Sequence, residues 1–239
     1  MKFIYGPVKS RRLGVSLGVN LTPFKTCSFD CVYCQLGKTT YSVLERKEFF
    51  KAEEIIAELK NFLATADLKS QLINYITLSG SGEPTLNSKI AEIIQGIKKI
   101  TNIPVAIITN SSLLFKEEVR RDLLAADLIM PTLNAATYET FNKICRPHSQ
   151  VNLENIVNGL IALRKEFKGK IYLELMLVKG VNDSLKEIEK LKEIVNLINP
   201  DKIFLTLPER ATSEDWVKPP EAKTLAKIKE ILGAKCEIV

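Results

Sequence analysis

The feature that most constrains the fold of this chain is a regular alternation of short apolar runs with stretches of helical periodicity. In one such stretch, Ile90, Ile93, Ile94 and Ile97 recur at the spacing that places residues on one face of a helix. Six apolar runs have the length of buried strands, and a helical pattern follows each of them. The expected strands are residues 15–21, 75–79, 105–109, 128–133, 171–178 and 203–207.

Six strand–helix units predict an α/β fold in which the strands form a parallel sheet with right-handed crossovers and helices cover at least one face. An open, partial TIM-like barrel of about six βα units fits this pattern best. The 239 residues can bury one core, and no Gly/Ser-rich linker or repeat interrupts them, so we expect a single domain over residues 1–239. In such folds the functional site lies at the carboxyl ends of the strands.

Composition narrows the possible partners and the compartment. Thirty-four Lys and Arg against 28 Asp and Glu give a net charge of +6, which suits a polyanionic partner but equally a lysine-rich soluble enzyme. Charge-free runs fall short of the ~20 apolar residues of a membrane span, and the first residues lack a signal-peptide pattern. We therefore expect no membrane association and a cytoplasmic location.

The single histidine, His148, excludes sites built on several histidines, including common catalytic zinc sites.

Three of the five cysteines lie within eight residues, directly after the first expected strand. Cys27, Cys31 and Cys34 have the spacing C-x3-C-x2-C, and no nearby histidine can supply the fourth ligand of a tetrahedral zinc site. A [4Fe–4S] cluster held through three irons, with the fourth iron open to another ligand, fits this set better. A zinc knuckle or buried free thiols are the alternative.

This motif resembles that of the radical S-adenosylmethionine (SAM) superfamily, whose members have an aromatic residue before the third cysteine, here Tyr33. The resemblance implies that SAM chelates the open iron and is cleaved by one electron to give a 5'-deoxyadenosyl radical, which abstracts a substrate hydrogen. It also implies a one-electron reductant of the flavodoxin or ferredoxin type as a partner.

The next strand ends in Ser81-Gly82-Glu83-Pro84, which resembles the Gly-Gly-Glu-Pro sequence that binds the methionine amino group in the superfamily, with Ser81 in place of the first glycine. The resemblance also implies cofactor contacts after the third, fourth and fifth strands. For the polar residues there, turn formation or helix capping is an equally good explanation. These further candidates are Asn110, Ser111, Asn134, Val181 and Asn182.

A closer resemblance covers almost the whole chain and is to the short radical proteins grouped with the tRNA wyosine synthases. It rests on stretches such as 6–8, 10–14, 146–148 and 216–220, and it implies a nucleoside in tRNA as a candidate substrate. Wyosine synthases of that group carry a second cluster on three upstream cysteines, whereas this chain has none before Cys27. We expect one cluster, with Cys145 and Cys236 as buried thiols.

Alternation within strand 171–178 directs Glu174 to the barrel interior and three leucines to the helices. An interior carboxylate needs a partner or a ligand. We therefore expect Glu174, Arg210 and Arg146 to meet a substrate over the barrel mouth as catalytic residues. The alternative is a structural ion pair between Glu174 and Arg210.

Three readings of the function remain open. If the substrate is RNA, Lys9, Arg11 and Arg12 would add phosphate contacts beside the mouth. A small molecule or a peptide is a second possible substrate, because the chain shows no dense RNA-binding patch. An electron carrier without catalysis is the third, but it would need a fourth cysteine ligand and no Glu83.

Overall fold

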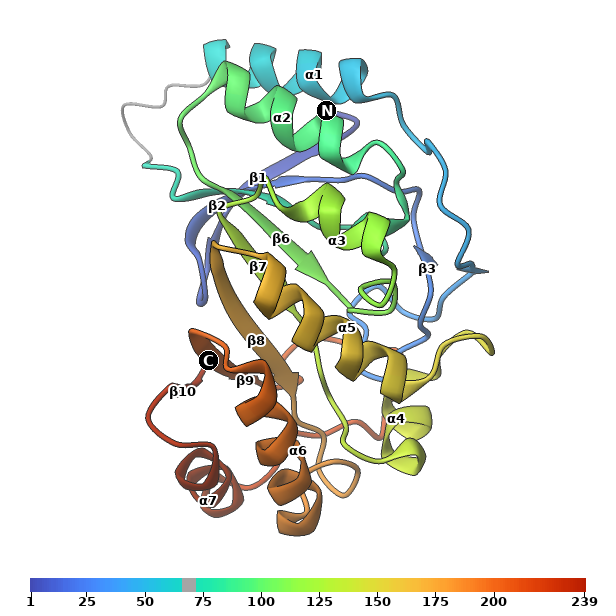
Figure 1. The fold of residues 1–239 in the computed structure, drawn as a ribbon, viewed down its shortest axis with the longest axis vertical. Helices are drawn as coiled ribbons and strands as arrows, with labels where there is room; N and C mark the ends of the chain where they lie inside the picture. The colour runs from blue at the N-terminus through green and yellow to red at the C-terminus, as the bar shows by residue number, and fades with distance from the viewer. Residues whose placement is uncertain (66–71) are drawn as a thin grey trace.

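The computed structural model describes residues 1–65 and 72–239, and its main sheet contains all six expected strands as parallel neighbours (Figure 1). The sheet curls into an open half-barrel, which confirms the predicted partial TIM-like barrel. In sheet order the six strands are β2 (Gly14–Val19), β5 (Tyr75–Leu78), β6 (Val105–Thr109), β7 (Leu128–Pro131), β8 (Lys170–Met176) and β9 (Lys202–Thr206).

Two further strands that we did not predict form the edges of this sheet. β1 (Ile4–Ser10) pairs antiparallel with β2, and β10 (Cys236–Ile238) pairs parallel with β9. β1 contains Pro7, which an edge strand tolerates because one side of it makes no ladder hydrogen bonds. The sheet therefore has eight strands, and the two short strands β3 (Thr26–Cys27) and β4 (Tyr41–Ser42) pair separately.

The helices follow the outside of the curled sheet (Figure 1). The predicted apolar stripe of α2 is fully buried at Ile90, Ile93, Ile94 and Ile97, and burial of each such side chain contributes roughly 1.5–3 kcal/mol. None of the helices in the described residues is long and apolar enough to cross a membrane. They are α1 (Ala52–Thr65), the 3-10 helix η1 (Pro84–Leu86), α2 (Ile90–Ile100), α3 (Glu117–Leu123), α4 (Tyr138–Cys145), α5 (Leu153–Glu166), α6 (Leu185–Ile198) and α7 (Ala222–Leu232).

The inner face of the half-barrel carries a small apolar cluster and, beyond it, polar side chains. Leu13, from the turn between β1 and β2, packs there with Met130 and Phe204. On β8 the alternation is as predicted: Leu173 and Leu175 join the outer core, whereas Glu174 lines an inner cavity. The turn before β2 thus fills the amino-terminal end of the half-barrel, and the space toward the carboxyl ends of the strands is available for a site.

Candidate active site

The three clustered cysteines lie on the loop that follows β2, at the carboxyl ends of the strands. Backbone hydrogen bonds fasten this loop on two sides. Lys25 N donates to Ser81 O at 2.7 Å and Glu83 N donates to Thr26 O at 3.1 Å, while Asp30 N donates to the carbonyl oxygen of Cys145 at 3.1 Å. The cysteine loop is therefore held between the turn after β5 and the end of α4.

Gly82 is the residue that allows the turn after β5 to approach the cysteine loop. A Cβ atom at Gly82 would lie 1.9 Å from the backbone oxygen of Thr26 and 2.7 Å from Thr22 Oγ1. No side chain fits at that distance, so only glycine permits this contact. Ser81 stands in place of the first glycine of the superfamily sequence. Its backbone is fixed in this turn, because its N–H donates to Asn20 Oδ1 at 2.9 Å.

The sulfur atoms of the cysteine loop receive hydrogen bonds from neighbouring polar groups. Asn110 Nδ2 donates to Cys27 Sγ at 3.4 Å. Burial and the nearby carboxylate of Glu83 raise the pKa of Cys27 to about 12, and a hydrogen bond to Cys145 together with burial raises the pKa of Cys31. Iron binds the thiolate form of cysteine, so ligation of a cluster would release the protons of these thiols.

Within residues 1–65 and 72–239, no three Cys, His, Asp or Glu side chains are arranged closely enough to hold a metal ion. The chemistry around the loop nevertheless fits an iron–sulfur cluster. Lys25 is only 2% exposed, and its ammonium donates to Cys34 Sγ at 3.1 Å. A buried ammonium is costly unless a negative charge lies beside it. A cluster with thiolate ligands on Cys27, Cys31 and Cys34 supplies such a charge.

Glu83 is fixed as a hydrogen-bond acceptor beside the cysteine loop. Its Oε1 atom accepts from Thr85 N at 3.1 Å, Thr85 Oγ1 at 2.6 Å and Thr109 Oγ1 at 2.7 Å, and its Oε2 atom accepts from Asn110 N at 2.7 Å. Burial raises the pKa of Glu83, against the hydrogen bonds, which lower it. A buried carboxylate held in this way is a suitable partner for an ammonium group of a ligand.

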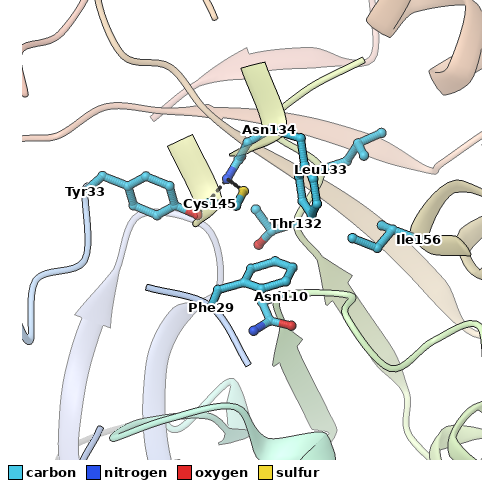
Figure 2. A pocket seen from close by; sticks show the side chains of 9 residues that line it. Phe29, Tyr33, Asn110, Thr132, Leu133, Asn134, Cys145 and Ile156 are labelled. Atoms are coloured by element: carbon cyan, nitrogen blue, oxygen red, sulfur yellow. Dashed lines mark hydrogen bonds between the residues drawn. The ribbon is translucent and has the colours of Figure 1, made fainter. Parts of the chain in front are cut away.

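Tyr33 and Asn134 meet over the end of β7 (Figure 2). Asn134 Nδ2 donates to the Tyr33 hydroxyl at 2.6 Å, and Asn134 Oδ1 accepts from Met176 N at 2.8 Å. Together with Asn110 and Cys145, both residues line a small pocket. The structure thus brings Tyr33, Asn110 and Asn134 together around this pocket.

Two of the predicted cofactor contacts have side chains already engaged with the backbone. Ser111 Oγ donates to Thr132 O at 2.9 Å and so joins the ends of β6 and β7. Asn182 is fully buried, and its amide bonds the backbone of Met176 and Asn134, each at 2.8 Å. These side chains position the strand ends, and the neighbouring Val181 is half-buried.

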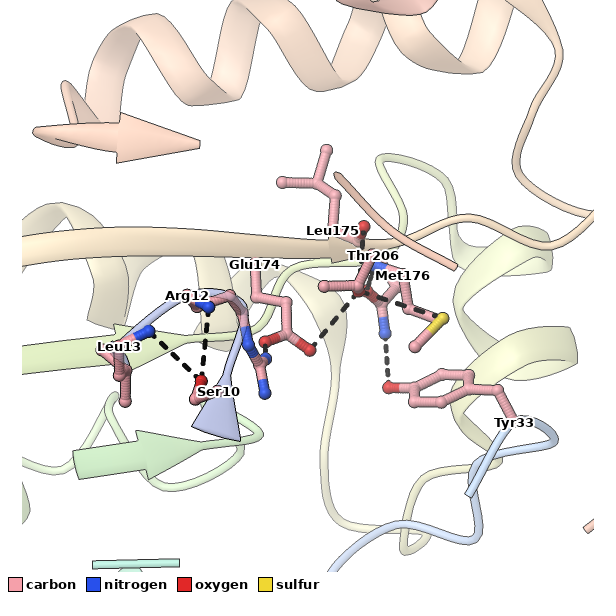
Figure 3. A network of polar contacts seen from close by, with 9 residues as sticks. Ser10, Arg12, Leu13, Tyr33, Glu174, Leu175, Met176 and Thr206 are labelled. Carbon is pink, nitrogen blue, oxygen red and sulfur yellow. Dashed lines mark hydrogen bonds and ion pairs between the residues drawn. The ribbon is translucent and has the colours of Figure 1, made fainter. Parts of the chain in front are cut away.

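Glu174 lines the inner cavity, but its partner differs from the one that we weighed. Arg12 forms an ion pair with the Glu174 carboxylate, and Thr206 Oγ1 donates to its other oxygen at 3.5 Å (Figure 3). Arg210 instead donates to Gln35 Oε1 at 3.1 Å. The alternative of a Glu174–Arg210 ion pair is therefore wrong, because the turn before β2 brings a nearer guanidinium.

Arg146 does not join Glu174 and Arg210. Its guanidinium bonds Glu214 at 2.5 Å and lies 3.8 Å from Asp30, outside the lining of the inner cavity. The residue ends α4 in the left-handed conformation, with φ 44°, which turns the chain back toward the cysteine loop. Glu174 and Arg210 do line one cavity of about 630 Å³, a volume that suits a small ligand or one flipped-out group of a larger one.

Comparison with known proteins decides the family. Residues 21–194 match the Radical SAM superfamily. This chain belongs to the radical SAM superfamily. It is 38% identical to a UPF0026 protein of Methanocaldococcus jannaschii over 98% of this chain and 73% of that protein. It is 44% identical to the GTPase Obg of Brachyspira hyodysenteriae over 99% of this chain, but it spans only 34% of that protein's length.

The fold of this radical SAM enzyme is similar to that of a solved TYW1 structure with a lysine–pyruvate adduct bound. The likeness covers 91% of this chain and 72% of that chain, with a TM-score of 0.68 and 18% identity. At that identity it supports the fold alone. Membership in the radical SAM superfamily itself implies that the enzyme uses SAM and an iron–sulfur cluster.

Sequence reasoning missed two residues of this radical SAM site. Lys25 lies two residues before the first cysteine, and nothing in its sequence context shows that its ammonium is buried. The sequence alone predicts Arg12 only as an RNA contact, although a buried carboxylate at Glu174 requires a cation nearby. The need of Glu174 for a cationic partner is therefore visible in the sequence, but the sequence does not show which of the several arginines lies beside it.

Proposed function

We propose that this radical SAM enzyme holds one [4Fe–4S] cluster through Cys27, Cys31 and Cys34 and binds SAM next to it. The observation that carries the proposal is the joint placement of the cysteine loop and the fixed Glu83 carboxylate at neighbouring strand ends. When bound, the cluster supplies the electron for reductive cleavage of SAM to the radical that abstracts a substrate hydrogen. A one-electron reductant of the flavodoxin or ferredoxin type would reduce the cluster again.

The side chains of this chain bind and orient SAM in the proposal. Glu83 accepts the SAM ammonium, and Ser81 and Gly82 form the tight turn that holds Glu83 beside the cysteine loop. Tyr33, Asn110 and Asn134 present their polar groups to the remaining part of SAM, since they line one pocket. Ser111, Val181 and Asn182 shape the strand ends that border the cofactor.

The substrate lies in the inner cavity in this proposal, where Glu174 and Arg210 face it. A nucleoside in tRNA is the candidate substrate suggested by the resemblance to the wyosine synthases. Cationic residues at the cavity support this choice, since RNA binding depends on phosphate neutralisation.

We expect tRNA affinity to fall with rising salt, and to fall less steeply for a Lys9→Ala, Arg11→Ala protein. Absence of tRNA binding at low salt would reject RNA and leave the radical mechanism in place.

Anaerobic reconstitution tests the proposed cluster. We expect about four irons per chain and the absorption of a [4Fe–4S] cluster in the wild-type protein, and loss of both in Cys31→Ala. Cys236→Ala is the matched control, because Cys236 is buried near the opposite edge of the sheet. Glu83→Ala should keep the cluster but bind SAM at least tenfold more weakly, since a hydrogen bond to a charged group is lost. Iron content in Cys31→Ala equal to that of the wild type would contradict the assignment of Cys31 as a cluster ligand.

A further inference from the structure

The inner cavity is bordered by two ion pairs that join segments far apart in the sequence. Arg12 pairs with Glu174 of β8 within the cavity, where both side chains are mostly buried. Arg11 pairs with Glu209 at 2.6 Å, and both of these side chains are about half exposed. Each of these two arginines therefore has its charge matched by a carboxylate.

Two further cations line the same cavity without a carboxylate partner. The ion pairs found among residues 1–65 and 72–239 include neither Lys9 nor Arg210. Arg210 donates to the neutral amide of Gln35, the residue that follows Cys34. The lining thus has two positive charges in excess, and one of them lies beside the cysteine loop.

The lowered pKa of Arg12 agrees with this excess of positive charge. Burial together with the nearby positive charges of Arg11 and Arg210 lowers the pKa of Arg12 to about 10. Like charges this close repel one another, and an anion bound among them would relieve the repulsion. The cavity is therefore electrostatically suited to a ligand with negative charge.

We propose that the inner cavity binds a substrate that carries a phosphate monoester, and that Arg210 and Lys9 bind this phosphate. A phosphate monoester carries about −1.5 to −2 charge at pH 7, which matches two unpaired cations better than a single carboxylate does. The planar guanidinium of Arg210 can donate two parallel hydrogen bonds to phosphate oxygens. Beyond the cations, Ile108, Met176 and Thr77 provide apolar and hydroxyl surface for the rest of the molecule.

This inference rests on the proposed radical reaction, because it places the substrate of that reaction next to the cysteine loop, but it does not rest on a tRNA nucleoside as the substrate, since the phosphates within an RNA chain are diesters. The phosphate can be carried by a free small molecule or by the 5' end of an RNA. Both sources present the same dianionic group to Arg210 and Lys9, and matched ligands with and without the phosphate distinguish them.

Calorimetric titration of the reconstituted, unreduced enzyme tests the inference. The probes are inorganic phosphate, ribose 5-phosphate against ribose, and a 5'-phosphorylated RNA oligonucleotide against its dephosphorylated form. We expect inorganic phosphate to bind, and each phosphorylated ligand to bind better than its partner. Arg210→Ala and Lys9→Ala should each weaken phosphate binding at least tenfold, because each removes a charge-assisted hydrogen bond. Arg121→Ala, which removes an exposed arginine on α3, is the control and should bind as the wild type does.

Equal phosphate affinity in the wild type, Arg210→Ala and Lys9→Ala would overturn the inference, as would no preference for the phosphorylated ligand in either pair. A preference confined to the RNA pair would assign the phosphate to RNA, and one confined to the ribose pair to a small molecule. Formation of 5'-deoxyadenosine from SAM is assayed separately on the same proteins. Loss of that activity with phosphate binding retained would reject the proposed function alone.

Discussion

Lys25 places a buried ammonium 3.1 Å from Cys34 Sγ, on a residue with φ 57°, a left-handed conformation that is uncommon outside glycine. A positive charge and an N–H···S hydrogen bond at a cluster ligand favour the reduced cluster, which carries the more negative charge. We expect Lys25→Met to lower the midpoint potential of the cluster by up to about 130 mV, since a charge-assisted hydrogen bond contributes ~1.5–3 kcal/mol and the couple transfers one electron.

A redox titration followed by electron paramagnetic resonance measures this potential. Lys25→Arg keeps the charge and a donor, so it should recover part of the shift, whereas a purely structural role would leave the potential unchanged in both proteins. An unchanged potential in Lys25→Met with full iron content would contradict the role given to Lys25.

Single residues also show how far the sequence could predict the site. The three cysteines are predicted as a ligand set from their spacing, whereas Glu83 is predicted only from the resemblance of Ser81-Gly82-Glu83-Pro84 to the superfamily sequence. Ser111 and Asn182 are predicted as cofactor contacts, and the sequence pattern does not show that their polar groups bond the backbone. The choice of Arg12 over Arg210 as the partner of Glu174 depends on where a distant turn lies, so no local pattern encodes it.

At the scale of elements, strand β1 depends on one carboxylate of α1. Glu58 Oε1 accepts from the backbone N–H groups of Lys2, Phe3 and Ile4, each at 3.0 Å. Burial raises the pKa of Glu58, but these hydrogen bonds outweigh it and the net pKa is lowered. We expect Glu58→Gln to reduce the free energy of unfolding by about 1–3 kcal/mol at pH 7, because the hydrogen bonds lose their charged acceptor.

The pH dependence of this effect follows from the lowered pKa of Glu58. A carboxyl with a lower pKa in the folded state stabilises the fold above its unfolded pKa of about 4.3, and this stabilisation is lost as pH falls through the folded pKa. Denaturant unfolding of wild type and Glu58→Gln should therefore differ at pH 7 and converge below about pH 4. Glu54→Gln, which removes only an exposed ion pair, is the control; a pH-independent difference for Glu58→Gln would refute this explanation.

The same strand explains a gap in the predicted fold. β1 contains Gly6 and Pro7 and alternates poorly between buried and exposed residues, so it lacks the signal of a central strand. β10 has only three residues and gains its partners from β9. Edge strands of this kind form because a neighbouring strand pairs with them, so their own sequence does not predict them. The six inner strands have continuous apolar runs, which predict buried strands.

At the scale of the whole molecule, the cysteine content predicts a single cluster. Cys236 is the first residue of β10 and is buried in the outer core, and Cys145 lies beside Cys31, although Cys145 and Cys31 are far apart in the sequence. Cys145 and Cys236 together cannot supply three thiolates for a second cluster. We expect a Cys145→Ala, Cys236→Ala protein to retain about four irons per chain after reconstitution. Loss of half the iron and sulfide would instead indicate a second cluster.

In the proposed function, the cysteine loop and the strand ends around Glu83 together bring about the reductive cleavage of SAM. Its most direct test is the formation of 5'-deoxyadenosine by the reconstituted, chemically reduced enzyme, quantified by mass spectrometry. We expect 5'-deoxyadenosine and methionine from the wild type and from Cys236→Ala, and none from Cys31→Ala. The absence of 5'-deoxyadenosine from wild-type protein with a full cluster, even with cell extract as a source of substrate, would contradict the claim.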